Sequence, residues 1–71
     1  MPKLPQILPR KIISKLKKLG FIHTRTSGSH YVLKHPDGRV TIIAFNIRPI
    51  ARGTLKAILK QTKLTIKDLA N

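Results

Sequence analysis

The chain has 71 residues, with fifteen lysines and arginines against two acidic residues, a formal net charge of +13 at pH 7 and 41% hydrophobic residues. We expect one small domain, residues 1–71, with a thin core, because a chain of this size buries only about 60% of the surface that its unfolded form exposes. The sequence contains no cysteine, which excludes disulfides, thiolate metal sites and cysteine nucleophiles and agrees with a cytoplasmic protein.

The charge is the first positive indication of function. Positive side chains that repel one another do not stabilise a fold, so the excess predicts a polyanionic partner: a nucleic acid, an anionic membrane or an acidic protein. The two acids, Asp37 and Asp68, argue against carboxylate or magnesium chemistry, because either would need both of them together. We therefore expect no metal and no cofactor.

Membrane insertion and export are not expected either. The longest apolar runs fall well short of the roughly 20 residues that a membrane-spanning helix needs. The first segment, Met1 to Leu8, contains two prolines and lacks the pattern of a signal peptide. A peptide that lies on a membrane surface is disfavoured as well, because the sequence predicts strands and turns instead of one long amphipathic helix.

The first expected element is an amphipathic helix from Arg10 to Leu19. Gly20 follows the last apolar position of its pattern, where glycine commonly ends a helix in the left-handed conformation. Four lysines of this segment lie mostly around the rest of the helix and predict a solvated face. The apolar side chains at helical spacing are Ile12, Ile13, Leu16 and Leu19.

Three strands are expected next. In Phe21 to Thr26 apolar and polar residues alternate poorly, but the segment is rich in aromatic and β-branched residues and predicts a strand. Ser27-Gly28-Ser29 predicts a tight turn after it. His30 to His35 is the second predicted strand. Pro36-Asp37-Gly38 is typical of a turn, so a third strand from Arg39 to Ala44 should return antiparallel and complete a meander.

The remaining third of the chain predicts a connection and more helix. Phe45 to Ala51 contains a proline and should be irregular, after which Gly53-Thr54 is expected to cap a helix that ends near Lys63. Thr65 is a suitable N-cap for a last helical turn through Leu69. The predicted fold class is α+β, in the order α-β-β-β-α, with two helices on one face of a three-stranded antiparallel sheet and the other face open.

His30 is the first candidate for chemistry. Cleavage of RNA without metal needs a base for the 2′-hydroxyl, an acid for the leaving oxygen and cations near phosphorus, and imidazoles titrate close to neutral pH. Strand parity places Lys34 on the face of His30, with Arg25 across the turn, and Gly28 allows a close backbone approach to a phosphate. Alternatively, His30 is an ordinary exposed histidine without a catalytic role, and Gly28 is needed only for the backbone conformation of the turn.

Several short motifs together suggest a family. They are Gly20-Phe21, Arg25, Gly28-Ser29-His30, His35, Asp37-Gly38 and Arg52-Gly53-Thr54-Leu55 followed by Ile58-Leu59. In their order and spacing the chain resembles the HicA toxins of bacterial toxin-antitoxin systems. The resemblance implies a fold like a double-stranded RNA-binding domain, endoribonuclease activity on mRNA, and neutralisation by an acidic HicB-like antitoxin. It implies a catalytic role for His30, and we expect these RNA-binding residues: Arg25, Gly28, Ser29 and Lys34.

The sequence departs from the family at one place. Many relatives carry Pro-x-His-Asn after the third strand, whereas this chain has Ile43-Ala44-Phe45-Asn46, so a second histidine is missing. The missing histidine keeps an alternative open, a non-catalytic RNA-binding module of the same shape or an attenuated toxin. Three aromatic residues, Phe21, Tyr31 and Phe45, could stack on bases, but in so small a domain an aromatic side chain more often belongs to the core.

Overall fold

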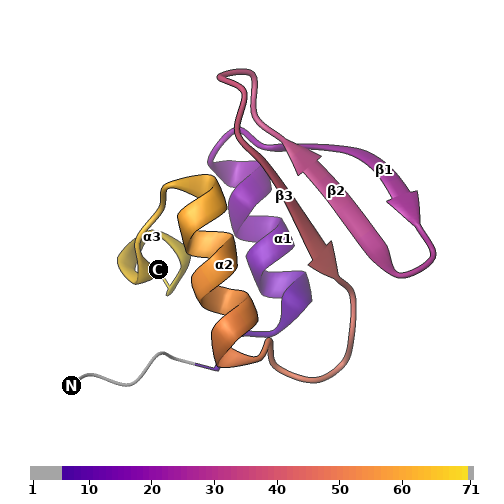
Figure 1. The fold of residues 1–71 in the computed structure, drawn as a ribbon, viewed down its shortest axis with the longest axis vertical. Helices are drawn as coiled ribbons and strands as arrows, with labels where there is room; N and C mark the ends of the chain where they lie inside the picture. Colours follow the sequence, from indigo (N-terminus) through magenta and orange to yellow (C-terminus); the bar gives the residue numbers. More distant parts are fainter. Residues whose placement is uncertain (1–5, 71) are drawn as a thin grey trace.

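The computed structural model describes residues 6–70, which form three helices and three strands (Figure 1). The elements are α1 (Pro9–Lys18), β1 (Ile22–Ser27), β2 (His30–Lys34), β3 (Val40–Ala44), α2 (Arg52–Thr62) and α3 (Ile66–Ala70). Every predicted element is present, with ends that differ by one or two residues. Most of Met1 to Leu8, which lacks the pattern of a signal peptide, lies outside the described residues.

The first helix begins at a proline and ends at a glycine. Pro9 suits the first turn, where its fixed φ is already helical and no N–H is needed. At the other end the Phe21 N–H donates to the Leu16 carbonyl at 2.9 Å, and the Gly20 N–H donates to the Lys17 carbonyl at 3.1 Å. This pair of bonds is a Schellman motif. Gly20 has a φ of +102°, which confirms the predicted cap.

Replacing Gly20 with alanine is expected to lower the free energy of unfolding by about 1–2 kcal/mol or more, because a side chain disfavours positive φ. A Cβ at Gly20 would also lie 2.8 Å from Nε2 of His35. Urea unfolding followed by circular dichroism measures the change. The matched control is Gly53→Ala, where a Cβ meets no atom within 4 Å, and we expect no loss there. Equal midpoints for the two variants would contradict this account of Gly20.

The strands form an antiparallel meander in the order β1-β2-β3. Leu33 and Thr41 are Cα partners and both are buried, so this face of the sheet points toward the helices. We call the opposite side the open face. Its side chains, by strand pairing and parity, are Ile22, Arg25, Ser27, His30, Val32, Lys34, Val40, Ile42 and Ala44.

A β-bulge interrupts β1. His23 is the Cα partner of Leu33, and two residues later Arg25 is the partner of Val32, so Thr24 is an extra residue in the strand. In a regular strand His23 and Arg25 would share a face. The bulge leaves Arg25 on the open face and turns His23 toward the helix side, which explains the poor alternation of this segment.

The start of α2 differs from the prediction. The expected cap at Gly53-Thr54 is wrong, because the helix begins at Arg52 with Ala51 as N-cap and no side chain accepts a capping hydrogen bond. The Ile50 N–H donates to the Ile7 carbonyl at 2.9 Å, just before the helix. A tertiary backbone contact therefore fixes this helix start, and local side-chain signals do not reveal it.

Arg39 ties the turn between β2 and β3 to the end of α2. Its Nη1 donates to the Thr62 carbonyl at 2.6 Å, and its Nε donates to Asp37 Oδ2 at 2.8 Å. The guanidinium carbon lies 5.1 Å from the centre of the Phe21 ring, a cation–π distance. The predicted turn is thus present and anchored to a helix.

One hydrophobic core holds the elements together. It takes side chains from α1, α2, α3, the strands β2 and β3, and the segments before and after α1: Ile7, Ile12, Ile13, Leu16, Phe21, Leu33, Ile43, Leu55, Ile58 and Leu69. Because these residues come from one face of the sheet and from the helices, the other face stays open. The order α-β-β-β-α with an open antiparallel sheet is the double-stranded-RNA-binding-domain-like arrangement, as predicted.

Candidate functional site

His30 is the first residue of β2 and lies exposed on the open face. Its Cα partners are Ser27 in β1 and Ala44 in β3. Both neighbours have small side chains, so the imidazole stands uncovered between them. A ring held on a strand but open to solvent on both sides is accessible to a large substrate.

A two-residue turn, Gly28 and Ser29, leads into His30. Gly28 has a φ of +58°, and positive φ at the first loop residue alone is typical of a type II′ hairpin turn. A Cβ at Gly28 would meet no atom within 4 Å, so the backbone conformation, and not space, requires glycine. The Phe45 N–H donates to the Ser29 carbonyl at 2.6 Å, which attaches the turn to the end of β3.

Two predicted cations share the open face with His30. Arg25 pairs with Val32, two residues along β2 from His30. Lys34 is four residues along the same strand, which is about 13 Å at 3.3 Å per residue. Arg25 is therefore placed near His30, whereas Lys34 lies at the far end of the face and suits a neighbouring phosphate.

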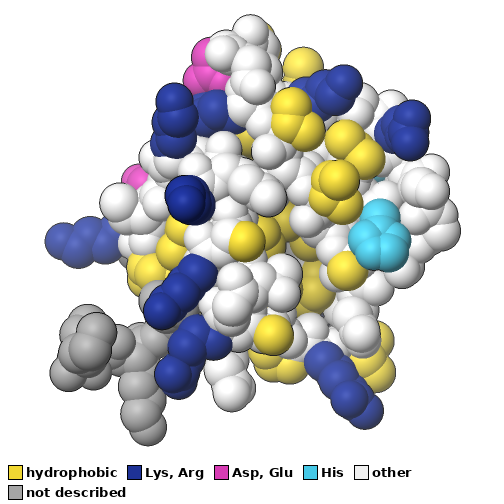
Figure 2. All heavy atoms as spheres, in the orientation of Figure 1, with side chains coloured by type: hydrophobic (Ala, Val, Ile, Leu, Met, Phe, Trp, Pro, Cys, Tyr) yellow, Lys and Arg dark blue, Asp and Glu magenta, His cyan; other side chains and the backbone are white. Residues whose placement is uncertain are grey.

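The open face is apolar from its middle, at Ile42, to the end that carries Lys34. Ile22, Val40 and Ile42 are 58%, 42% and 52% exposed. Figure 2 shows hydrophobic side chains gathered over the strands, with lysines and arginines around them and a histidine beside them. An apolar surface edged by positive charge suits a partner that is itself apolar and acidic.

His35 lies at the opposite end of the sheet from His30. It follows β2, packs edge-on against Phe21 with ring centres 5.1 Å apart, and contacts Asp37 through Nδ1. Desolvation raises the pKa of Asp37, but hydrogen bonds from the backbone and side chain of Arg39, with its charge, outweigh this and hold the pKa below 3.8. These groups stabilise a turn and are remote from His30 in the fold.

The sequence did not reveal a row of stacked rings on the helix side of the sheet. His23 and Tyr31 stack with ring centres 4.6 Å apart, and Tyr31 and Phe45 stack at 5.4 Å. We call these three residues the aromatic row. Phe45 follows β3, yet its ring points toward Tyr31 and away from His30. The position at which relatives carry a second histidine is therefore on the other side of the sheet from the His30 ring.

Asp68, the second acidic residue, serves the start of α3. Hydrogen bonds from the backbone N–H and hydroxyl of Thr65 to its carboxylate lower the pKa of Asp68 below 3.8. The Asp68 N–H in turn donates to Thr65 Oγ1 at 3.4 Å, which confirms Thr65 as the N-cap. Residues 6–70 contain no cluster of three potential metal ligands. Nor does any described helix combine the length and hydrophobicity of a transmembrane segment.

Comparison with known families decides the classification. The protein-family model described as HicA toxin of bacterial toxin-antitoxin matches residues 9–64, which are most of the 71-residue chain. The chain belongs to the HicA toxin family. A comparison with curated proteins found no match.

The HicA region includes both long helices and the whole sheet. His30, Arg25 and Lys34 all lie within the matched residues, and so does the departing residue Phe45. The last helix, α3, lies beyond the match, although its Leu69 is 5% exposed and contributes to the core.

Proposed function

We propose that this protein is the toxin of a HicA/HicB-like pair, a metal-independent endoribonuclease that cleaves mRNA in the cytoplasm and is held inactive by an acidic HicB-like antitoxin. The observation that carries the proposal is the placement of His30, exposed on the open face of a HicA-family domain, between two small side chains and close to Arg25. Both acids are engaged in local hydrogen bonds, which disfavours carboxylate chemistry at this face.

The proposed reaction uses the 2′-hydroxyl of the RNA. The His30 imidazole takes the 2′-hydroxyl proton while O2′ forms a bond to phosphorus and the bond from phosphorus to O5′ breaks. Water, or the imidazolium just formed, supplies the proton that the leaving O5′ needs. Arg25 stabilises the negative charge that grows on the phosphoryl oxygens. The backbone amides of the turn, at Gly28 and Ser29, lie beside the same phosphoryl group. The upstream product carries a 2′,3′-cyclic phosphate.

A non-catalytic RNA-binding module is the second candidate. The observation that favours it is the direction of Phe45, which places a stacked ring, and no second imidazole, next to the turn that precedes His30. Such a module would keep the basic surface and bind RNA without breaking it.

Cleavage of a labelled single-stranded transcript in EDTA separates the two functions. We expect cleavage by the purified protein, and no cleavage of a DNA copy or of an RNA with 2′-deoxyribose at the cut sites, because neither has the nucleophile. Binding without cleavage, under conditions in which the protein is folded, would favour the RNA-binding module. Cleavage of the DNA copy would contradict the role of the 2′-hydroxyl.

RNA binding is expected to weaken steeply with salt. For a single strand, the slope of log affinity against log salt is about −0.7 for each phosphate neutralised. In a cleavage-deficient His30→Ala background, Lys34→Ala should lower both the affinity and the slope, because Lys34 lies on the open face. Lys17→Ala, an exposed change on α1, is the control and should do little. A flat salt response, or equal effects of the two lysines, would contradict this assignment.

A further inference from the structure

We propose that the aromatic row is a stacking platform for the bases of single-stranded RNA, so that the strand passes around the edge of the sheet from the row to His30. The inference rests on the proposed function, because it assigns a binding path to the substrate of that site. It concerns the side of the sheet that faces away from the His30 ring.

The geometry of the row suits stacking. The planes of His23 and Tyr31 meet at 15° and those of Tyr31 and Phe45 at 25°, so the three rings are nearly parallel. Because Tyr31 is stacked between the other two rings, bases would stack on the outer faces of His23 and Phe45 and so continue the row. The β1 bulge makes this possible, because it turns His23 to the side on which Tyr31 lies.

Exposure distinguishes the row from ordinary core. Phe21, a true core ring, is 2% exposed, whereas Phe45 is 43% exposed and the other two members of the row are half-buried. The β1–β2 hairpin projects beyond the helices (Figure 1), so the row lies at the margin of the core, against which Tyr31 packs. A ring kept in solvent on so basic a protein indicates a partner with both aromatic and anionic groups.

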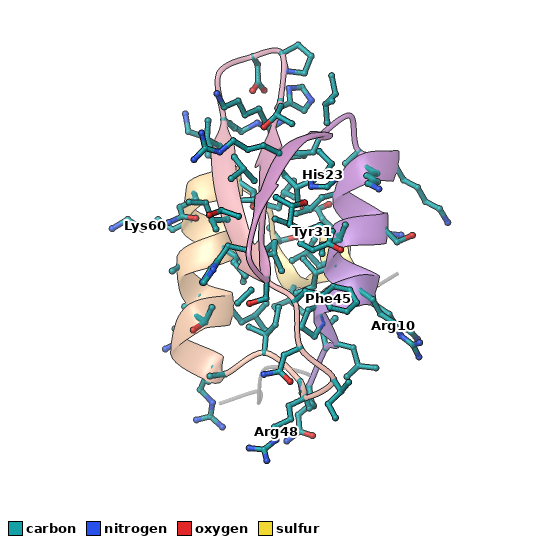
Figure 3. All side chains as sticks on the ribbon, turned by 90° about the vertical axis from the view of Figure 1, so that its right-hand side faces the viewer. Arg10, His23, Tyr31, Phe45, Arg48 and Lys60 are labelled. Carbon is teal, nitrogen blue, oxygen red and sulfur yellow. The ribbon has the colours of Figure 1, made fainter. Side chains whose placement is uncertain are left out.

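Positive charge continues from the end of the row. In Figure 3 the rings follow one another from His23 through Tyr31 to Phe45, with Arg10 and Arg48 beyond Phe45. Phe45 and Arg10 also line one hollow of 310 Å³, together with Leu8, Asn46 and Ile47. Stacking rings that lead into arginines match the alternation of bases and phosphates along a single strand.

The row also connects to His30 through the backbone. The Phe45 N–H donates to the Ser29 carbonyl, so the end of the row lies at the sheet edge beside the turn that carries His30. A single strand can place bases on the row and a phosphodiester at His30, whereas a duplex keeps its bases stacked inside and cannot use the rings. The observations therefore favour single-stranded over double-stranded RNA.

Tyrosine fluorescence tests the proposal directly. Tyr31 is the only tyrosine and the chain has no tryptophan, so the emission of the protein reports on the row. In the His30→Ala background we expect a single-stranded RNA oligonucleotide to quench this emission, and a duplex of the same sequence to quench it much less. Phe45→Leu should weaken single-strand binding about 5- to 150-fold, with an unchanged salt slope, because stacking releases no counterions.

Two further variants control for folding and for general hydrophobicity. Phe45→Tyr keeps the ring face and should bind like the parent protein, while Leu19→Ala, an exposed change at the end of α1, should have no effect. Unchanged affinity in Phe45→Leu, or a duplex that binds and quenches as well as the single strand, would overturn the proposal. Quenching with no cleavage by the wild-type protein would contradict the proposed enzyme but support the row. If the wild type and Phe45→Leu both cleave RNA and bind it with equal affinity, the result would support the proposed enzyme and contradict the role of the row.

Discussion

Replacing His30 with alanine is expected to abolish RNA cleavage and leave the fold intact. General acid and base catalysis by a positioned side chain contributes about 10²–10⁴-fold, so the variant should lose at least two orders of magnitude in rate. The fold should survive because the ring is exposed at the start of a strand and packs against only small neighbours. Cleavage of a labelled transcript and thermal melting, measured on the same preparation, check both parts of the prediction.

His35→Ala is the matched control. This histidine packs against Phe21 at the opposite end of the sheet, so its removal should lower the melting temperature and spare cleavage well below that temperature. The two variants should thus show opposite patterns, activity lost with stability kept, and stability lost with activity kept. Wild-type cleavage by His30→Ala would remove His30 from the mechanism, and equal loss of cleavage in both variants would indicate a structural effect.

Co-expression with an acidic protein encoded by a neighbouring reading frame is expected to yield a tight complex that does not cleave RNA. Opposite net charges speed the encounter and make its rate fall with ionic strength. Burial of Ile22, Val40 and Ile42 supplies apolar contact area on the face that carries His30. Because such a partner binds the folded state, the melting temperature should also rise. Purification by a tag on one protein, followed by cleavage assays, measures the effect.

A pair of substitutions locates the binding face. Ile42→Lys adds a charge to the middle of the open face and should weaken the complex at least tenfold, which restores cleavage at moderate partner concentration. Ala57→Lys adds the same charge to an exposed position of α2 and should leave the complex intact. If both variants bind equally well, the partner does not cover the open face. If no complex forms with any neighbouring acidic protein, the toxin-antitoxin proposal loses its main support.

Much of the fold could be predicted because its signals are local. Apolar residues at helical spacing located α1, and the glycine at position 20 located its end, since only a residue without a side chain adopts that positive φ easily. The turn chemistry of Pro36-Asp37-Gly38 fixed the return of the third strand. Strand parity was enough to place Lys34 on the face of His30, because β2 is regular from His30 to Lys34.

The features that could not be predicted depend on contacts between distant segments. The bulge at Thr24 follows from pairing with β2, and one extra residue reverses the side on which His23 lies. Parity with Thr41 and Ile43 gives the side of Phe45, but its stacking on Tyr31, fourteen residues earlier in the printed sequence, follows from the pairing of β2 with β3. Similarly, the start of α2 is set by a backbone bond from Ile50 to Ile7. None of these contacts leaves a signature in a short window of sequence.

Few of the positive charges are neutralised by acidic side chains of the same chain, and this lowers the stability of the fold. Asp37 is paired with Arg39, and Asp68 is occupied by Thr65, so thirteen positive charges remain without compensation from the chain itself. Their mutual repulsion opposes the compact state, and dissolved salt screens that repulsion. If the protein binds RNA as proposed, the same salt competes with phosphates for the basic surface and releases the strand. Ionic strength then acts with opposite sign on the two equilibria of this small domain, strengthening folding as it weakens the proposed hold on RNA.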